Sequence, residues 1–166
     1  EVFDHVPVDE KFDFSKQLFP KLLEMGWPMY AQTIDGVWFD VGQPFELINA
    51  QAALMAQYDE LPFSYPTSYR QDGDVLHADN ATLDGVVARS VLGDATVVEA
   101  GASVVDSLLM DGCRVGSGAT VSGSVIGRGV WIPPNTVLNA CVVGDGADLV
   151  PGRSYAEEKL ATKAVQ

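Results

Sequence analysis

The stretch Trp38–Pro44, WFDVGQP, places a single carboxylate at the point where an apolar run ends. Asp40 has apolar neighbours on both sides, and a glycine and a proline follow it. Gly42 leaves room for a close approach, and Pro44 suits the first position of a helix, where its missing N–H is not needed. On these residues alone, Asp40 is a candidate to accept hydrogen bonds from the backbone at the start of that helix.

The remaining side chains that could do chemistry are scattered along the chain. A solvated helix face explains the lysines, and packing explains the first of the two cysteines, which occupies a small-residue position of the repeat described below. The cysteines show no metal-ligand spacing, and their small number is typical of a reducing compartment, the cytoplasm. The full set of remaining candidate side chains is Lys16, Lys21, His5, His77, Cys113 and Cys141.

Composition narrows the class of protein. The 166 residues are 47% hydrophobic and 20% charged, with a formal net charge of −13. Such an acidic chain is a poor partner for nucleic acid or an anionic membrane, since both are polyanions. No apolar run approaches the roughly 20 residues that span a bilayer, and no signal-peptide pattern is present. Because the chain begins without methionine and in ordinary domain-like sequence, we expect it to be a piece of a longer protein.

Residues 1–60 have a mixed α/β pattern. Helical turns are expected over 15–26, interrupted at Pro20 and ending at Gly26. YAQTI and VWF predict two strands around the turn Asp35-Gly36, with Trp38 packed in the core. From Pro44 a helix is predicted to follow, and residues 61–74 are expected to form a connector. The helix has one apolar face, which carries Phe45, Ile48, Ala52 and Met55.

From Val75 the pattern becomes a repeat. Aliphatic residues recur in steps of six, six and five, so the pattern restarts every 17 residues. Small or aliphatic residues stand four positions after most of them, and glycines and prolines lie between. The first set is Leu92, Val98, Val104, Leu109, Val115, Val121, Ile126, Ile132, Leu138, Val143 and Leu149. The second set is Thr96, Ala102, Cys113, Ala119, Val125, Val130, Thr136, Val142 and Ala147.

This spacing predicts a three-sided coil over residues 75–153, in which each side points one aliphatic residue inward and a small one near the corner. Stacked coils bury a continuous column. An antiparallel sandwich is the alternative that the short strands leave open. The first coil, residues 75–91, fits less well, because Asp79 falls on an inward corner. After Arg153, Ser154-Tyr-Ala-Glu157 resembles a capping box, which predicts a terminal helix over 154–166.

Two motifs carry a resemblance to known proteins. The coil pattern is that of hexapeptide repeats and resembles a left-handed parallel β-helix. The first half, FDFSKQLFPKLLEMGWPMYAQTIDGVWFDVGQPFELINA, is similar to the C-terminal part of the sugar-1-phosphate nucleotidyltransferase domain, with D-F-x-K-x-x-F-P-x-L followed by G-x-W-x-D-x-G. That family includes glucose-1-phosphate thymidylyl- and uridylyltransferases and mannose-1-phosphate guanylyltransferases. The resemblance therefore implies the end of an α/β catalytic domain over residues 1–60, followed by the β-helix.

The same resemblance implies a function. It predicts transfer of a nucleotidyl group from a nucleoside triphosphate to a sugar 1-phosphate, with release of pyrophosphate. It makes Asp40 a ligand of Mg²⁺, whose charge offsets the repulsion between the two anionic substrates, and Gly42 a substrate-binding residue. The family's glycine-rich phosphate loop is absent from these 166 residues, so no catalytic residue is assigned here, and one carboxylate is not expected to bind Mg²⁺ well.

Alternatives remain open. The chain could be a non-catalytic β-helix module for oligomerisation or regulation, and a homo-oligomer through residues 90–150 is expected because such columns pack against each other. Some hexapeptide-repeat proteins are acyltransferases with a histidine as general base. The coils from Leu92 to Leu149 contain no histidine, so that function would depend on His77 in the poorly fitting first coil.

Overall fold

The computed structural model describes residues 1–162, which form two units, Glu1–Gly36 and Val37 onwards. The first unit contains a 3-10 turn η1 (Val2–His5), a π-helical turn η2 (Phe14–Leu18) and a short helix α1 (Phe19–Glu24). Leu18 and Leu22 are its buried residues. Its interior is therefore small, built on one helical segment.

Local hydrogen bonds explain where this helical segment begins and ends. Asp13 Oδ1 accepts a bond from the Lys16 backbone N–H at 2.8 Å, while the Asp13 N–H donates to Gln17 Oε1, also at 2.8 Å. This reciprocal pair satisfies donors at the helix start. At the other end, Gly26 adopts a positive φ of 73°, and the Trp27 N–H donates to Leu22 O. The predicted end of the helix at Gly26 is confirmed.

The predicted hairpin around Asp35-Gly36 is wrong for this structure, because residues 27–43 contain no strand. Gly36 does take a positive φ, as a turn requires. However, Tyr30 is 94% exposed and Trp38 is 71% exposed, so the prediction that Trp38 packs in a core is also wrong. An isolated two-stranded hairpin is marginal in water without further strands or a packed face, which accounts for the extended backbone seen here.

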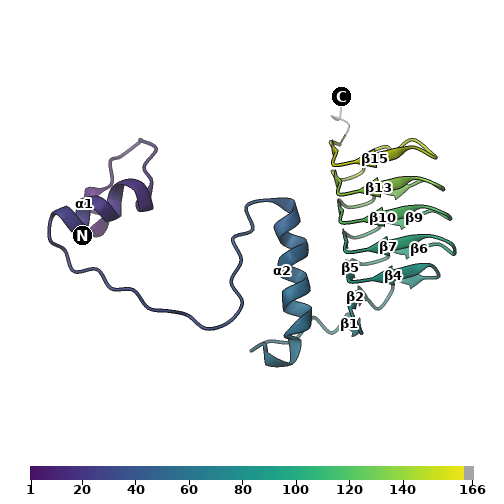
Figure 1. Ribbon diagram of the computed structural model, residues 1–166, viewed down its shortest axis with the longest axis horizontal. Coiled ribbons are helices and arrows are strands. Elements are labelled where there is room, and N and C mark those ends of the chain that lie inside the picture. Colours follow the sequence, from purple (N-terminus) through teal and green to yellow (C-terminus); the bar gives the residue numbers. More distant parts are fainter. Residues whose placement is uncertain (163–166) are drawn as a thin grey trace. The chain divides into compact units, whose positions relative to one another are not determined.

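Helix α2 (Pro44–Ala56) begins at the predicted proline and belongs to the second unit. A 3-10 turn η3 (Tyr58–Glu60) follows it. Gln51 of α2 donates to Ser107 O at 3.4 Å, and Gln71 donates to Met55 O at 3.3 Å. These bonds hold α2 against the coils that follow (Figure 1). Met55 is the buried residue of α2.

The rest of the second unit is a β-solenoid with three sheets. The seven-stranded sheet has the order β1 (Tyr69–Asp72), β2 (Val75–Ala78), β5 (Ser90–Leu92), β8 (Leu108–Leu109), β11 (Val125–Ile126), β14 (Val142–Val143), β16 (Lys159–Leu160). The five-stranded sheet runs β15 (Ser154–Ala156), β13 (Val137–Asn139), β10 (Thr120–Ser122), β7 (Ser103–Val105), β4 (Val86–Ala88). The four-stranded sheet runs β12 (Trp131–Ile132), β9 (Arg114–Val115), β6 (Val97–Val98), β3 (Thr82–Leu83).

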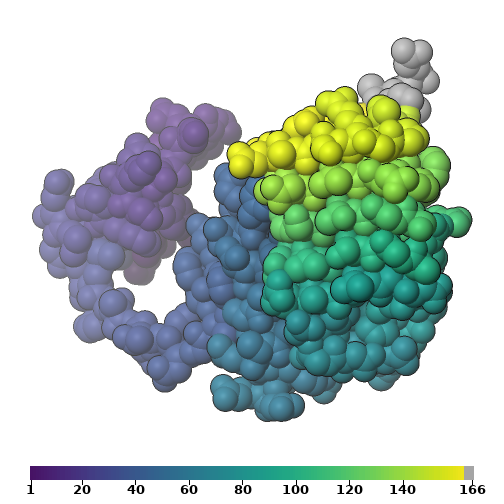
Figure 2. Space-filling view, turned by 45° about the vertical axis from the view of Figure 1, so that its right-hand side comes forward, coloured from purple at the N-terminus to yellow at the C-terminus, as the bar shows by residue number. Residues whose placement is uncertain are grey.

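Most strand pairs are parallel, so the antiparallel sandwich is excluded. Val121 of β10 pairs with Val104 and with Leu138, each 17 residues away. The exception is β1, which pairs antiparallel with β2 at the first coil and lies within the predicted connector. The coils form one continuous stack from β2 to β16 (Figure 2). The predicted parallel coil is confirmed.

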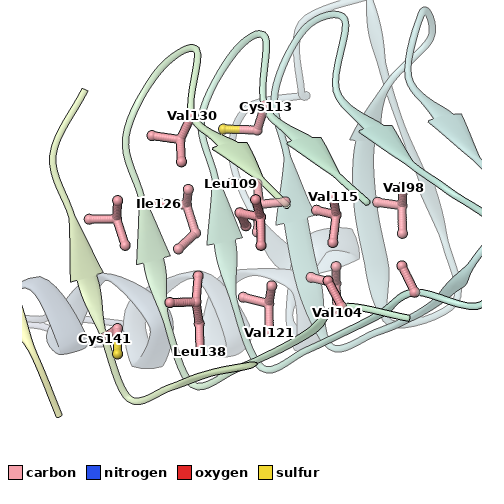
Figure 3. Packing of buried hydrophobic residues seen from close by; sticks show 14 of the residues in the cluster. Val98, Val104, Leu109, Cys113, Val115, Val121, Ile126, Val130, Leu138 and Cys141 are labelled. Atoms are coloured by element: carbon pink, nitrogen blue, oxygen red, sulfur yellow. The ribbon is translucent and has the colours of Figure 1, made fainter. Parts of the chain in front are cut away.

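The predicted aliphatic column fills the interior. All eleven predicted inward residues are between 0 and 8% exposed. Figure 3 shows Val104, Val121 and Leu138 in one row and Leu109 and Ile126 in another. At roughly 1.5–3 kcal/mol for each fully buried aliphatic side chain, this column is the main source of stability for the solenoid.

One corner of the coil differs from the prediction. Val125 and Val142 were expected near a corner, but they line a cavity between the seven-stranded sheet and α2. The corner is occupied by the residues three positions after the inward one, because the third side is one residue shorter. These residues are Ser107, Ser124 and Cys141, and all three are fully buried.

The terminal helix predicted over 154–166 is wrong for its described part. Ser154–Ala156 and Lys159–Leu160 are strands, and residues 163–166 lie outside the described residues. Tyr155 pairs in register with Leu138 and is 4% exposed, so it continues the inward column for another coil. Sheet pairing at the 17-residue period outweighs the local capping signal. The first coil also differs from the prediction. Asp79, which was expected at an inward corner, is exposed, and His77 takes the inward position, paired with Leu92.

Substitution of Leu109 by alanine should lower the free energy of unfolding by about 2–5 kcal/mol, because it leaves a cavity in the column. Val86, which is 65% exposed, provides the matched control. Val86→Ala should change the free energy of unfolding by less than about 0.5 kcal/mol. Urea unfolding followed by circular dichroism measures both, and equal losses would contradict this assignment of the core.

Candidate functional site

Asp40 lies in the extended segment that leads into α2, and its side chain is exposed. The alternative that it caps the helix is wrong. The N-cap residue is Gln43, and no side chain caps that end. The Gly42 N–H donates to the Asp40 backbone carbonyl at 2.9 Å, which turns the chain towards the helix. Within residues 1–162, the Asp40 carboxylate has no hydrogen bond or ion pair.

The described residues do not fit a magnesium ion at Asp40. Mg²⁺ prefers several oxygen ligands in near-octahedral geometry, held by carboxylates, water and substrate phosphates. No group of three His, Cys, Asp or Glu side chains suited to a metal gathers anywhere in residues 1–162. Asp40 therefore offers one exposed carboxylate, and further ligands would have to come from outside these residues.

Gly42 has a different setting. It lines a cavity of about 390 Å³ together with Leu47 on α2 and Met110, Val125 and Val142 on the solenoid. A methyl group added at Gly42 would have Asp40 Oδ1, at 3.8 Å, as its nearest neighbour, so the position is open. The structure places Gly42 next to Asp40 but in a mainly apolar hollow, with no cation beside it to bind phosphate.

The histidines are engaged within the fold. His77 is 2% exposed. Its Nδ1 lies 3.0 Å from Ala78 O, and its Nε2 lies 3.0 Å from Asp72 Oδ2. This geometry holds β1 against β2 and leaves no ring nitrogen facing solvent, so nothing here favours a general base. His5 stacks edge-on against the Trp27 ring at 5.3 Å.

The lysines of the first unit are exposed. Lys21 Nζ donates to His5 O at 3.4 Å, and the Lys16 backbone N–H is used at the helix start. Neither lysine ammonium group has a further hydrogen-bond or ion-pair partner among residues 1–162. This arrangement is that of a solvated helix face, as the sequence indicated.

Ion pairs between coils organise the solenoid surface. Arg89 donates to both carboxylate oxygens of Asp106, at 2.6 and 2.8 Å, and these bonds lower the pKa of Asp106. Hydrogen bonds from Arg114, followed by one from the Ser117 N–H, lower the pKa of Glu99. The partners come from neighbouring coils, and the arginines are exposed while the carboxylates are half-buried, so each pair contributes little to stability.

The two cysteines are free and buried. Cys113 Sγ donates to Gly127 O at 3.0 Å. Burial is the main reason that the pKa of Cys113 is raised, to about 11. At neutral pH the thiol is therefore protonated and is a poor nucleophile.

Residues 73–148 match the protein family described as GlmU-like, C-terminal hexapeptide. The matched residues are those of the parallel coils. The solenoid is thus similar to the hexapeptide repeats of that family. Among the residues that the structure describes, no helix is long and apolar enough to cross a membrane.

The chain is similar to curated proteins that are named as nucleotidyltransferases. It is 29% identical over 110 residues to a UTP–glucose-1-phosphate uridylyltransferase of Synechocystis, which covers 63% of this chain and 28% of the relative. It is 31% identical over 113 residues to a glucose-1-phosphate adenylyltransferase of Clostridioides difficile, which covers 58% of this chain and 29% of the relative. The chain thus spans less than a third of these relatives. The predicted resemblance to sugar-1-phosphate nucleotidyltransferases is confirmed.

Cys113 should be unreactive in the folded protein. Because the folded pKa lies above the ordinary value of 9.0, its contribution to stability is complete below pH 9.0 and is lost as the pH rises through about 11. A chromogenic disulfide reagent should modify Cys113 in urea and leave it intact at pH 7 in buffer, as read by mass spectrometry. Rapid modification at neutral pH without urea would show that the coil opens there.

Proposed function

We propose that this chain is the C-terminal portion of a Mg²⁺-dependent sugar-1-phosphate nucleotidyltransferase, which transfers a nucleotidyl group from a nucleoside triphosphate to a sugar 1-phosphate and releases pyrophosphate. The observation that carries the proposal is the similarity to two enzymes whose names state this kind of reaction. The aligned part of this chain, 63% for the uridylyltransferase, is longer than the hexapeptide segment 73–148. The likeness is therefore not limited to the repeat.

Exposed apolar residues in the first half support the same proposal. Ile34 and Trp38 are each 71% exposed, and Tyr30 is 94% exposed. These three large side chains fall within nine residues of the chain, and a group of exposed apolar side chains usually marks a site of contact with other protein. A sheet of the catalytic domain is the proposed partner for this segment, as the sequence resemblance implies.

The roles of Asp40 and Gly42 belong to this proposal. Asp40 is proposed as one ligand of the Mg²⁺, completed by groups outside residues 1–162, and Gly42 as a point of close approach for substrate. The exposed carboxylate, which has no partner among residues 1–162, is available for such a role. The left-handed sense of the coil and a cytoplasmic location are proposed on the same resemblance, and the two free cysteines fit that compartment.

The second candidate function is a non-catalytic module. The self-contained column of the solenoid favours it, since the coils bury their own core without help from residues 1–36. The two candidates differ in one measurable respect, which is whether the gene product that contains this chain turns over substrate.

The gene product with whatever segment precedes Glu1 should release pyrophosphate from a nucleoside triphosphate and a sugar 1-phosphate, and residues 1–166 alone should not. In the active product, Asp40→Ala should lower kcat/KM by more than about 100-fold, because loss of even an outer partner of a metal ligand costs roughly 10–100-fold. Asp35→Ala, an exposed carboxylate in the same half, serves as the control. Full activity of Asp40→Ala would remove the metal role.

We propose that the solenoid binds further copies of the same chain. Helix α2 covers the seven-stranded sheet, whereas the four-stranded sheet presents Trp131, which is 53% exposed, beside Arg114. Exposed tryptophan next to arginine is typical of interface centres. We place the interface on this face, within residues 90–150.

Sedimentation velocity should give a species larger than the 17.8 kDa monomer. Trp131→Glu should shift it towards the monomer, because a carboxylate would be buried without a partner. Trp38→Glu alters a more exposed tryptophan outside the coils and should leave the assembly unchanged. A wild-type chain that sediments as a monomer at every concentration would contradict the proposal.

A further inference from the structure

A second hollow lies at the end of α2, away from Asp40. It is an open hollow of about 500 Å³, lined by the last turn of α2, η3, strand β1 and Tyr65 between them. All of these belong to the second unit. No sequence motif marks this hollow, because its lining is divided between the end of the α2 region and the predicted connector.

Aromatic rings form part of its wall. The rings of Tyr58 and Tyr65 are stacked, with centroids 4.0 Å apart and planes inclined by 11°. The Tyr65 backbone N–H also donates to Tyr58 Oη at 3.2 Å. Tyr69 of β1 lines the same hollow. Tyrosine rings held in this way present electron-rich faces and edges to a ligand without much loss of conformational freedom.

The charge of the wall is negative. Asp59 and Glu60 line the hollow, and neither has an ion pair or a side-chain hydrogen bond among residues 1–162. The C-terminal end of α2 adds the negative end of a helix dipole. Arg70 is the opposing charge, but its Nε lies 3.6 Å from Asp72 Oδ2 and donates to His77 Nε2 at 3.3 Å. Burial, then the charges of Asp94 and Asp111, raise the pKa of Tyr69.

Two buried oxygens of the lining residues have no partner among the described residues. They are Tyr65 Oη and Gln71 Oε1. The Gln71 amide cannot simply be reversed, because its Nε2 donates to Met55 O at 3.3 Å and to Gly73 O at 3.0 Å. An unpaired buried acceptor carries a desolvation cost that a donor would remove. Neither oxygen is paired with Arg70, the guanidinium on the same wall, which is engaged with Asp72 and His77.

We propose that this hollow binds a small organic cation that carries a primary ammonium group. An ammonium group supplies three donors for the oxygens, a positive charge for Asp59 and Glu60, and a partner for the tyrosine rings. A metal ion suits the wall less well, because residues 1–162 bring no three His, Cys, Asp or Glu side chains together. An anion would meet the two carboxylates.

Putrescine is the probe, titrated into the 166-residue chain at low ionic strength and followed by calorimetry and by amide NMR shifts. We expect the shifts to centre on Tyr65 and Gln71. The double variant Asp59→Asn/Glu60→Gln should weaken binding by about tenfold, since two partly exposed ion pairs are worth up to roughly 1 kcal/mol each. Tyr65→Phe should weaken binding by about threefold without lowering Tm, because it removes a buried hydroxyl that has no partner.

Matched controls separate this site from general attraction to a chain of net charge −13. Glu24→Gln/Asp35→Asn changes the net charge by the same amount at exposed positions of the first unit and should leave binding intact. The diol of the same length as putrescine should not bind. The proposal is overturned if both double variants weaken binding equally, if the diol binds as well as the diamine, or if Mg²⁺ alone produces the shifts at Tyr65.

Discussion

The 17-residue register between neighbouring coils is the constraint on which this structure depends. Parallel pairing places Val104, Val121 and Leu138 one above another, so each coil buries its aliphatic residues against the coils on either side. A single coil could not bury this surface alone. The backbone bonds and the hydrophobic column therefore stabilise each other, and neither would persist without stacking.

Polar residues follow the same register. Ser107 Oγ accepts from the Ser124 N–H at 3.2 Å and donates to Val105 O at 2.8 Å within its own coil. Small residues are required where coils approach closely. A methyl group at Gly93 would lie 2.7 Å from the Asp111 backbone nitrogen, and one at Gly127 would lie 2.6 Å from that of Asp145. The corners are thus fixed by backbone spacing as firmly as the sides are by burial.

The sequence predicted the parts of the fold whose signal repeats. The column from Leu92 to Leu149 could be predicted because the same pattern occurs in several coils, so an error in one coil does not change the overall assignment. Isolated signals were less reliable. The segment with the capping box at Ser154 forms a strand paired with the sheet and no helix, and the hairpin around Asp35 does not form. Both outcomes depend on which segments lie beside these residues in space. Asp40 could be singled out by its motif, whereas the tyrosine-lined hollow joins residues 55–73 through packing that leaves no local pattern.

Each coil advances the solenoid by one strand spacing, about 4.8 Å. Since every coil repeats the same contacts with its neighbours, adding or deleting 17 residues would lengthen or shorten the column by one such increment while preserving its cross-section. The repeat therefore behaves as a graduated spacer. Evolution can tune the separation between elements docked along its length, such as α2, without redesigning the interior that supports them.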